Sequence, residues 1–119
     1  YLTQKDIRQV QLAKGAVRAG VEALLENKNI KAKDVDAIQI AGSFGYHLRA
    51  KSLISMGMLP KEFEGKIEFV GNTSKTGGTA FLLNTDFRDE MQRAVKKIES
   101  VELSNKESFD KIFVKALSF

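Results

Sequence analysis

The stretch AIQIAGSFG, residues 37–45, decides how the rest of this sequence is understood. Its alternating isoleucines are typical of a strand with one buried face, and we predict that strand over Val35–Ala41. Gly42 ends the strand, and the chain then turns. Open α/β sheets bind ligands outside the carboxyl ends of their strands, so a turn in this position is a candidate binding site.

Four residues form the turn: Gly42, Ser43, Phe44 and Gly45. The two glycines remove side chains, so a flat base or a phosphate can lie against bare backbone, with the Ser43 hydroxyl and an apolar wall from Phe44 beside it. The alternative is a tight strand-to-helix turn that needs glycine for geometry alone, and the local pattern by itself favours that alternative. The spacing is not the dinucleotide-binding fingerprint, because no third glycine follows at the required position.

A second glycine turn follows the next predicted strand, Ile67–Val70. Gly71 and Asn72 leave this strand and enter a helix, whose free amides can bind an anion or a ribose. The segment is not a Walker phosphate loop, because Lys75 precedes the glycine pair 77–78 instead of following it. Glycines within a helix cost roughly 1 kcal/mol each relative to alanine, so we expect this pair to pack closely against another backbone.

The first helix is predicted from a cap at Thr3 to about Asn27. Apolar residues recur at helical spacing on two faces, so we expect the helix to be well buried. Gln11, Lys14 and Arg18 form a polar stripe along it. Such a stripe is either the solvent face of the helix or the lip of a cleft, and the periodicity leaves both open.

The remaining elements alternate in type along the chain. Further helices are predicted over residues 48–58, 73–83, 86–98 and 108–117, and a short strand over 101–103. This order favours the α/β class, a single domain in which helices lie against a sheet.

Length and composition fit one soluble domain. The chain has 119 residues, 43% of them hydrophobic and 29% charged, which is enough to form a core. No apolar run approaches the roughly 18 residues of a membrane span. The net charge of +4 comes from lysines scattered among acids, which favours a solvated surface over a nucleic-acid face. Because the chain begins with Tyr1, we expect it to be part of a longer protein.

The sequence offers no catalytic constellation. It has no cysteine and one histidine, His47, so it supplies neither a thiolate metal site nor an iron–sulfur cluster. The lack of cysteine fits a reducing cytoplasm. We therefore predict no catalytic residue and no metal ligand, and we expect this chain to contribute binding, with any reactive groups elsewhere.

Five segments together resemble one family, the C-terminal domain of reductive activators of corrinoid proteins. The resemblance runs nearly end to end, in order and with similar gaps. The segments that carry it are residues 3–14, 40–48, 54–60, 69–73 and 109–117.

This resemblance implies a fold and a function. The family joins an N-terminal ferredoxin-like iron–sulfur domain to a larger domain of the actin-like, sugar-kinase and chaperone ATPase fold. It couples ATP to the reduction of cob(II)amide to cob(I)amide on a corrinoid iron–sulfur protein. By this resemblance, residues 1–119 are one C-terminal subdomain whose partners are a nucleotide and that corrinoid protein, with no nucleic acid and no membrane. The iron–sulfur cluster, the phosphate loops and most Mg²⁺ ligands would lie in other parts, and a homodimer stays open.

The resemblance also assigns site residues. The turn from Gly42 to Gly45 would be the adenosine-binding turn, with Ser43 standing where the family pattern leads us to expect glycine or alanine. Gln11 and Lys14 resemble the glutamate and lysine that chaperone-type ATPases place near adenosine, although Gln11 replaces an acid. Gly71 and Asn72, at the second turn, would line the same cleft.

Two other functions remain open from the sequence. One is an ATP-binding activator or regulator of a different redox protein, built on the same fold. The other is a non-catalytic interaction domain, in which the glycine turns serve the backbone only.

Overall fold

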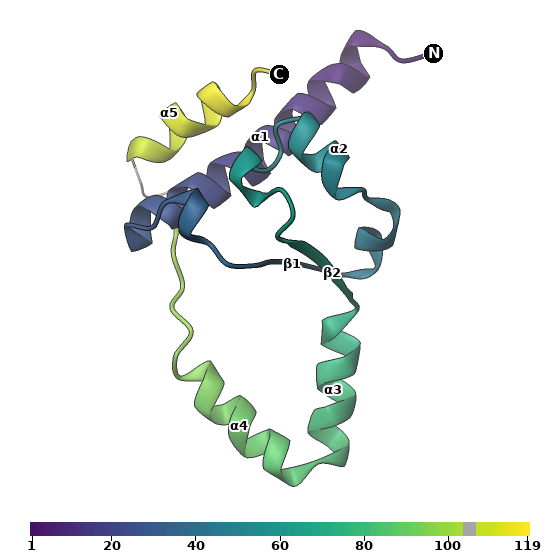
Figure 1. Ribbon diagram of the computed structural model, residues 1–119, viewed down its shortest axis with the longest axis vertical. Helices are drawn as coiled ribbons and strands as arrows, with labels where there is room; N and C mark the ends of the chain where they lie inside the picture. The colour runs from purple at the N-terminus through teal and green to yellow at the C-terminus, as the bar shows by residue number, and fades with distance from the viewer. Residues whose placement is uncertain (104–106) are drawn as a thin grey trace.

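The computed structural model describes residues 1–103 and 107–119, apart from the side chains of Phe44, Tyr46 and Glu107. Within these residues it is a mixed structure of helices and one small parallel sheet (Figure 1), as the predicted α/β class requires. The helices are α1 (Gln4–Lys28), α2 (Ala50–Ser55), α3 (Thr73–Leu83), α4 (Thr85–Val95) and α5 (Glu107–Ala116). The strands are β1 (Ile38–Ala41) and β2 (Ile67–Gly71), and the 3-10 turns are η1 (Ala32–Asp34), η2 (Ser43–His47) and η3 (Lys61–Phe63).

The two strands run parallel, so their carboxyl ends lie at the same edge. Ile38 pairs with Ile67 and Ile40 with Phe69, and the register shifts just before the strands end. Parallel strands need a crossover connection, which α2 and η3 provide here. This pairing brings the two glycine turns of the sequence to one place.

Strand β1 is shorter than predicted. The expected start at Val35 is wrong, because that residue closes η1 and its carbonyl accepts a hydrogen bond of 2.6 Å from the Lys66 Nζ. Lys66 also donates to the carbonyl of Lys33 at 2.8 Å, so its side chain holds this loop beside the sheet. The ladder begins only at Ile38, whose N–H donates to the Lys66 carbonyl at 2.8 Å.

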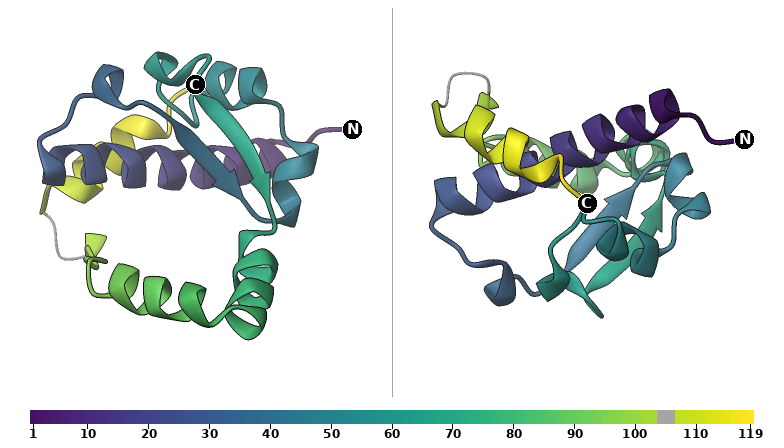
Figure 2. Two further views of the ribbon diagram at one scale, coloured as in Figure 1. Left: turned by 60° about the horizontal axis from the view of Figure 1, so that its bottom comes forward. Right: turned by 90° about the horizontal axis from the view of Figure 1, so that it is seen from above.

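A small core joins the crossover to both strands and to α1. Leu53, Leu59 and Phe63 are buried, and they pack against residues of α1 and of both strands. The α1 and strand side chains in this cluster are Val21, Leu25, Ile38, Ile40 and Ile67. Because α1 shares the core with both strands, it forms a helical layer on the sheet, as the two views in Figure 2 show.

Helix α1 is less buried than its sequence predicts. A capping box at Thr3 starts it, and Asn29 ends it in the left-handed conformation. Its buried residues are Lys14, Gly15, Ala19 and Ala23 only. Large apolar side chains on its other faces are exposed: Ile7, Val10, Leu12, Val17 and Leu24. The expectation of a well-buried helix is therefore wrong within the described residues, because α5 and the small core cover one stripe of it.

Helix α5 lies along α1, although the two are at opposite ends of the chain (Figures 1 and 2). A Cβ atom on Gly15 would lie 2.9 Å from the Leu117 Cδ2. The glycine therefore lets the end of α5 approach α1 closely, which explains a residue that is unfavourable within a helix.

Helices α3 and α4 form an arm that projects from this body (Figure 1). Asn84 links them, because its Oδ1 accepts hydrogen bonds from Asp86 N–H at 2.9 Å and Phe87 N–H at 3.2 Å. Arg88 fixes the corner by donating to the carbonyls of Phe81 and Leu82. The arm makes the molecule extended: its radius of gyration is 16.8 Å, against about 13.5 Å for a compact domain of this length.

Several predicted boundaries need correction. Residues 101–103 do not form a strand; they include a single 3-10 residue, Leu103. The helix predicted over 48–58 is confined to Ala50–Ser55, since Leu48 and Arg49 are extended after η2 and a turn at Gly57 ends it. The ends of α4 and α5 differ from prediction by one to three residues. Among the described residues, no helix is long and apolar enough to cross a membrane.

Candidate functional site

Two glycine turns meet at the carboxyl ends of β1 and β2. The N–H of Gly42 donates a hydrogen bond of 2.7 Å to the carbonyl of Gly71. Both residues have positive φ, 105° at Gly42 and 69° at Gly71, which non-glycine residues adopt at a cost. The structure thus brings together the two turns that the sequence singled out.

The glycines of the first turn serve different purposes. A Cβ atom on the buried Gly45 would lie 3.4 Å from the Phe69 Cδ1 and 3.6 Å from the Ile40 Cγ2, which are ordinary packing distances. A Cβ atom on Gly42 would meet no described atom within 4 Å. The geometric explanation therefore fits Gly42, whose φ is 105°, and the same residue also leaves space beside the backbone among the described atoms.

Ser43 and Phe44 begin η2 directly after Gly42. Ser43 is exposed, so its hydroxyl is accessible at this edge. The apolar wall predicted from the side chain of Phe44 lies outside the described part. The turn closes with a hydrogen bond of 3.2 Å from the Gly45 N–H to the Gly42 carbonyl.

Asn72 starts α3 on the other side of the edge. Its Oδ1 accepts a hydrogen bond of 3.0 Å from the Lys75 N–H, so the side chain caps the helix. The remaining polar group of the side chain, Nδ2, makes no hydrogen bond in the described part of the chain. Asn72 is exposed and can therefore donate to a ligand held at this edge.

A hollow of about 600 Å³ opens beside Asn72 along the first turns of α3. Its other lining residues are Lys75, Thr76, Thr79 and Ala80. We did not predict these positions as site residues, yet a signal was present, since Lys75 and Thr76 precede Thr79 by four and three residues, which places them on one helix face with it. They give this end of the site one cation and two hydroxyl oxygens that can accept from a ligand, since the hydroxyls of Thr76 and Thr79 already donate to the carbonyls of Asn72 and Lys75.

The glycine pair of α3 does not behave as expected. A Cβ atom on Gly77 or Gly78 would meet no described atom within 4 Å. The prediction of close packing against another backbone is therefore wrong for this part of the chain. Figure 1 shows that α3 reaches away from the body here.

Lys14 and Gln11 lie elsewhere, on α1. Lys14 is only 1% exposed, its Nζ donates to the carbonyl of Ser118, and it lies 4.7 Å from the centroid of the Phe119 ring. Gln11 is half-buried nearly one turn earlier. Neither residue lines the hollow beside Asn72, so the structure divides the predicted site residues between two places.

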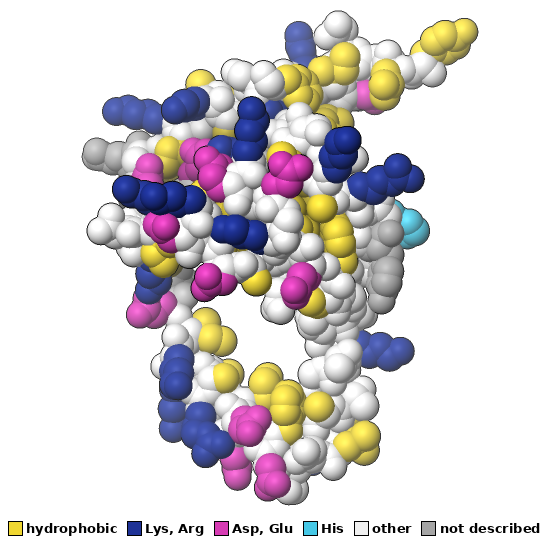
Figure 3. Space-filling view, viewed as in Figure 1, with side chains coloured by type: hydrophobic (Ala, Val, Ile, Leu, Met, Phe, Trp, Pro, Cys, Tyr) yellow, Lys and Arg dark blue, Asp and Glu magenta, His cyan; other side chains and the backbone are white. Residues whose placement is uncertain are grey.

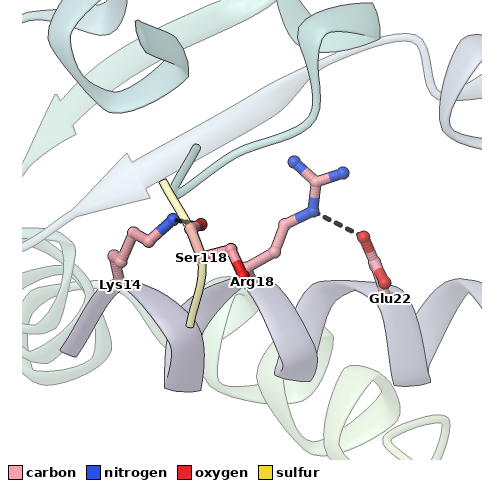
Figure 4. A network of polar contacts seen from close by, with 4 residues as sticks. All are labelled: Lys14, Arg18, Glu22 and Ser118. Atoms are coloured by element: carbon pink, nitrogen blue, oxygen red, sulfur yellow. Dashed lines mark hydrogen bonds and ion pairs between the residues drawn. The ribbon is translucent and has the colours of Figure 1, made fainter. Parts of the chain in front are cut away.

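A second pocket, of about 300 Å³, surrounds Lys14. Arg18 lines the same pocket, and its Nε is 2.6 Å from the Glu22 Oε1 (Figure 4). Of the two interpretations left open for the polar stripe, the lip of a cleft is the one that fits Lys14 and Arg18. The periodicity alone could not show this, because the opposite wall comes from α2, η3 and the segment after α5.

The described residues contain no group of three or more His, Cys, Asp or Glu side chains placed to hold a metal ion. His47 is exposed at the end of η2. The donor groups at the strand edge are backbone amides, hydroxyls, an amide and a lysine, which suit a base, a ribose or an anion better than a metal ion.

Comparisons with known proteins agree on one family. The whole chain, residues 1–119, matches the family described as the C-terminal domain of RACo, the ASKHA domain. Over 85 residues, which are 71% of this chain, it is 40% identical to the "Corrinoid activation enzyme RamQ" of Eubacterium limosum. It is also 26% identical over 120 residues, covering 99% of this chain, to the "[Co(II) methylated amine-specific corrinoid protein] reductase" of Methanosarcina barkeri. The matched regions are 14% and 22% of the lengths of these two relatives.

Proposed function

Because the chain belongs to the family described as the C-terminal domain of RACo, the ASKHA domain, we propose that it is the nucleotide-binding C-terminal portion of an ATP-dependent reductive activator. The whole activator returns a corrinoid protein from cob(II)amide to cob(I)amide. The names of the two relatives, a corrinoid activation enzyme and a corrinoid protein reductase, support this proposal.

One observation carries the nucleotide assignment: the hydrogen bond from Gly42 to Gly71 joins two glycine turns at the carboxyl ends of parallel strands. Ligands of open α/β sheets bind at such an edge. The open space beside Gly42 admits a flat base or a ribose against the backbone. The Ser43 hydroxyl and the Asn72 side-chain amide then supply hydrogen bonds to the polar atoms of adenosine.

The residues present indicate which steps this chain serves and which belong to other parts of the activator. Reduction of Co(II) to Co(I) takes one electron, and the chain has no cysteine to hold an iron–sulfur donor. ATP supplies the driving force that a low-potential reduction needs. In this proposal the cluster, the phosphate loops and the Mg²⁺ ligands belong to other parts of the longer activator. This chain holds the adenosine end of the nucleotide.

Two glycine substitutions test the assignment. Gly42→Ala places a methyl group where the nucleotide would lie, whereas Gly65→Ala serves as the control, because Gly65 also has positive φ (77°) and open space around it. Both substitutions place a Cβ atom at a positive φ and take on backbone strain of about 1–3 kcal/mol. We expect Gly42→Ala to weaken ATP binding about tenfold in calorimetric titrations, and Gly65→Ala to leave the affinity unchanged.

The titrations are made on this chain and on the full-length activator. Equal weakening by both substitutions would attribute the effect to strain in the fold and not to the site. Unchanged affinity in Gly42→Ala, or no ATP binding in the full-length protein, would contradict the nucleotide assignment.

A further inference from the structure

The pocket around Lys14 is unusual in its charge. Four of its lining side chains are cations, namely Lys14, Arg18, Lys61 and Lys115, and Glu22 is the one carboxylate among them. These cations come from α1, η3 and α5, so three separate elements place positive charge around one cavity of about 300 Å³. Like charges gathered in this way repel one another unless an anion is bound between them.

Lys14 is the buried member of this group. Its side chain is 1% exposed, and the only hydrogen bond of its Nζ in the described residues goes to the Ser118 carbonyl. The ring of Phe119 covers the ammonium group at 4.7 Å. No carboxylate of the described part pairs with it. A buried ammonium group normally has a charged partner. The described residues supply no such partner for Lys14, so a bound anion would complete the site.

Arg18 uses one of its three guanidinium nitrogens in a contact with the described residues. Its Nε is paired with Glu22, while its two terminal nitrogens point away from that carboxylate (Figure 4) and make no hydrogen bond to the described residues. A guanidinium with two free N–H groups side by side matches the oxygens of a phosphate.

The opposite wall does not favour a cation. The chain turns at the end of α2, and one carbonyl of this wall, that of Ile54, already accepts a hydrogen bond of 2.9 Å from the Gly57 N–H. Gly57 brings the wall close, since a Cβ atom there would lie 3.3 Å from the Lys14 Nζ. The side chains that line the cavity therefore carry four positive charges against one carboxylate.

We propose that this cavity binds a small phosphate-class polyanion, of the charge and size of pyrophosphate or a phosphorylated small molecule. The excess of three cations over carboxylates matches a multiply charged anion. The volume lies at the lower limit of small-ligand pockets. The site shares no lining residue with the strand edge proposed for adenosine, so it does not depend on the function proposed above.

Pyrophosphate is the probe for the test, with amide chemical shifts of this chain as the readout. We expect saturable shifts at residues 54–57 and 115–118, and an affinity that falls as NaCl is added. The double variant Lys61→Gln and Lys115→Gln should bind pyrophosphate about tenfold more weakly. Both lysines are exposed, so the variant is expected to fold, whereas a change at buried Lys14 would also undo the contact with Ser118.

The matched control is Lys51→Gln with Lys111→Gln. These exposed lysines lie on α2 and α5 but outside the cavity, and their loss changes the net charge equally. The control should keep the parent affinity. Equal weakening in both double variants would reduce the effect to general attraction by a basic surface and overturn the proposal.

Two further outcomes would also overturn it. One is the absence of saturable shifts at residues 54–57 and 115–118 with pyrophosphate. The other is tighter binding of a hexaglutamate peptide than of pyrophosphate at the same residues, which would identify the cavity as a contact for an acidic protein segment. Neither result bears on ATP binding at Gly42, which the separate glycine variants measure.

Discussion

Single side chains decide how the two ends of this chain meet. Lys14 donates to the carbonyl of Ser118 and lies under the ring of Phe119, and the neighbouring Gly15 leaves room for Leu117. One turn of α1 thus holds the segment that follows α5. The same lysine forms the floor of the basic cavity, so the contact that joins the chain ends also places the positive charge.

Gly77 and Gly78 give a prediction at this scale. Each lies in α3 with no described atom near the position of a Cβ atom, so alanine should fit without a clash. Alanine is favoured over glycine within a helix by roughly 0.5–1 kcal/mol. We expect Gly77→Ala and Gly78→Ala each to raise the free energy of unfolding of this chain by about that amount in urea titrations. A loss of stability would show that something packs against these glycines after all.

Helix α1 illustrates how local chemistry fixes an element. Thr3 and Asp6 form a reciprocal capping box: the Thr3 N–H donates to the Asp6 carboxylate at 2.8 Å, and the Asp6 N–H donates to the Thr3 Oγ1 at 3.2 Å. The Thr3 hydroxyl also donates to that carboxylate, and this hydrogen bond is the main reason why the pKa of Asp6 lies below its ordinary value.

The capping box predicts a pH dependence. Because the pKa of Asp6 is lowered on folding, its contribution to stability is complete above the ordinary pKa of the carboxyl group. That contribution is lost as the pH falls through the lowered pKa. Thr3→Ala should raise the pKa of Asp6, as measured by carboxyl ¹³C shifts. Glu99 is the internal control, because Lys28 lowers its pKa independently and Thr3→Ala should not move it. An unchanged Asp6 pKa in the variant would contradict this account.

The elements that could be predicted are those set by local pattern. The helix over Thr73–Leu83 was predicted at its observed ends, and α1 and β2 were predicted to within about a residue, because caps and turns bound them. The strand at 101–103 and the start of β1 were wrong, because tertiary contacts decide short elements, such as those that Lys66 makes with the loop before β1.

The candidate site could also be predicted only where local sequence pattern determines it. Both glycine turns stand out in the sequence, and the structure brings them together through strand pairing. The basic cavity was not predictable, because Lys61 and Lys115 are far from Lys14 in the sequence and only the packing of α5 on α1 unites them. Periodicity within one helix cannot identify residues that a different element brings to it.

The whole molecule is an extended body with an arm. Helices α3 and α4 contact chiefly each other. Hydrophobic side chains gather on the inner side of the arm, around the opening between the arm and the body (Figure 3). Leu82, Leu83 and Ile98 are more than 70% exposed. The regions matched by this chain are 14% and 22% of the lengths of its two relatives, and we expect further parts of the proposed activator to cover these side chains.

The central claim, that ATP bound at the Gly42 turn drives corrinoid reduction, is tested most directly by electron paramagnetic resonance. Cob(II)amide has an unpaired electron and cob(I)amide has none, so the signal of the corrinoid protein reports the reaction. With the full-length activator and a titanium(III) donor, we predict that the signal decays only when ATP is present. We predict that Gly42→Ala slows this decay about tenfold at limiting ATP, and that Gly65→Ala does not. Decay at the parent rate in Gly42→Ala, or an equal rate without ATP, would contradict the account.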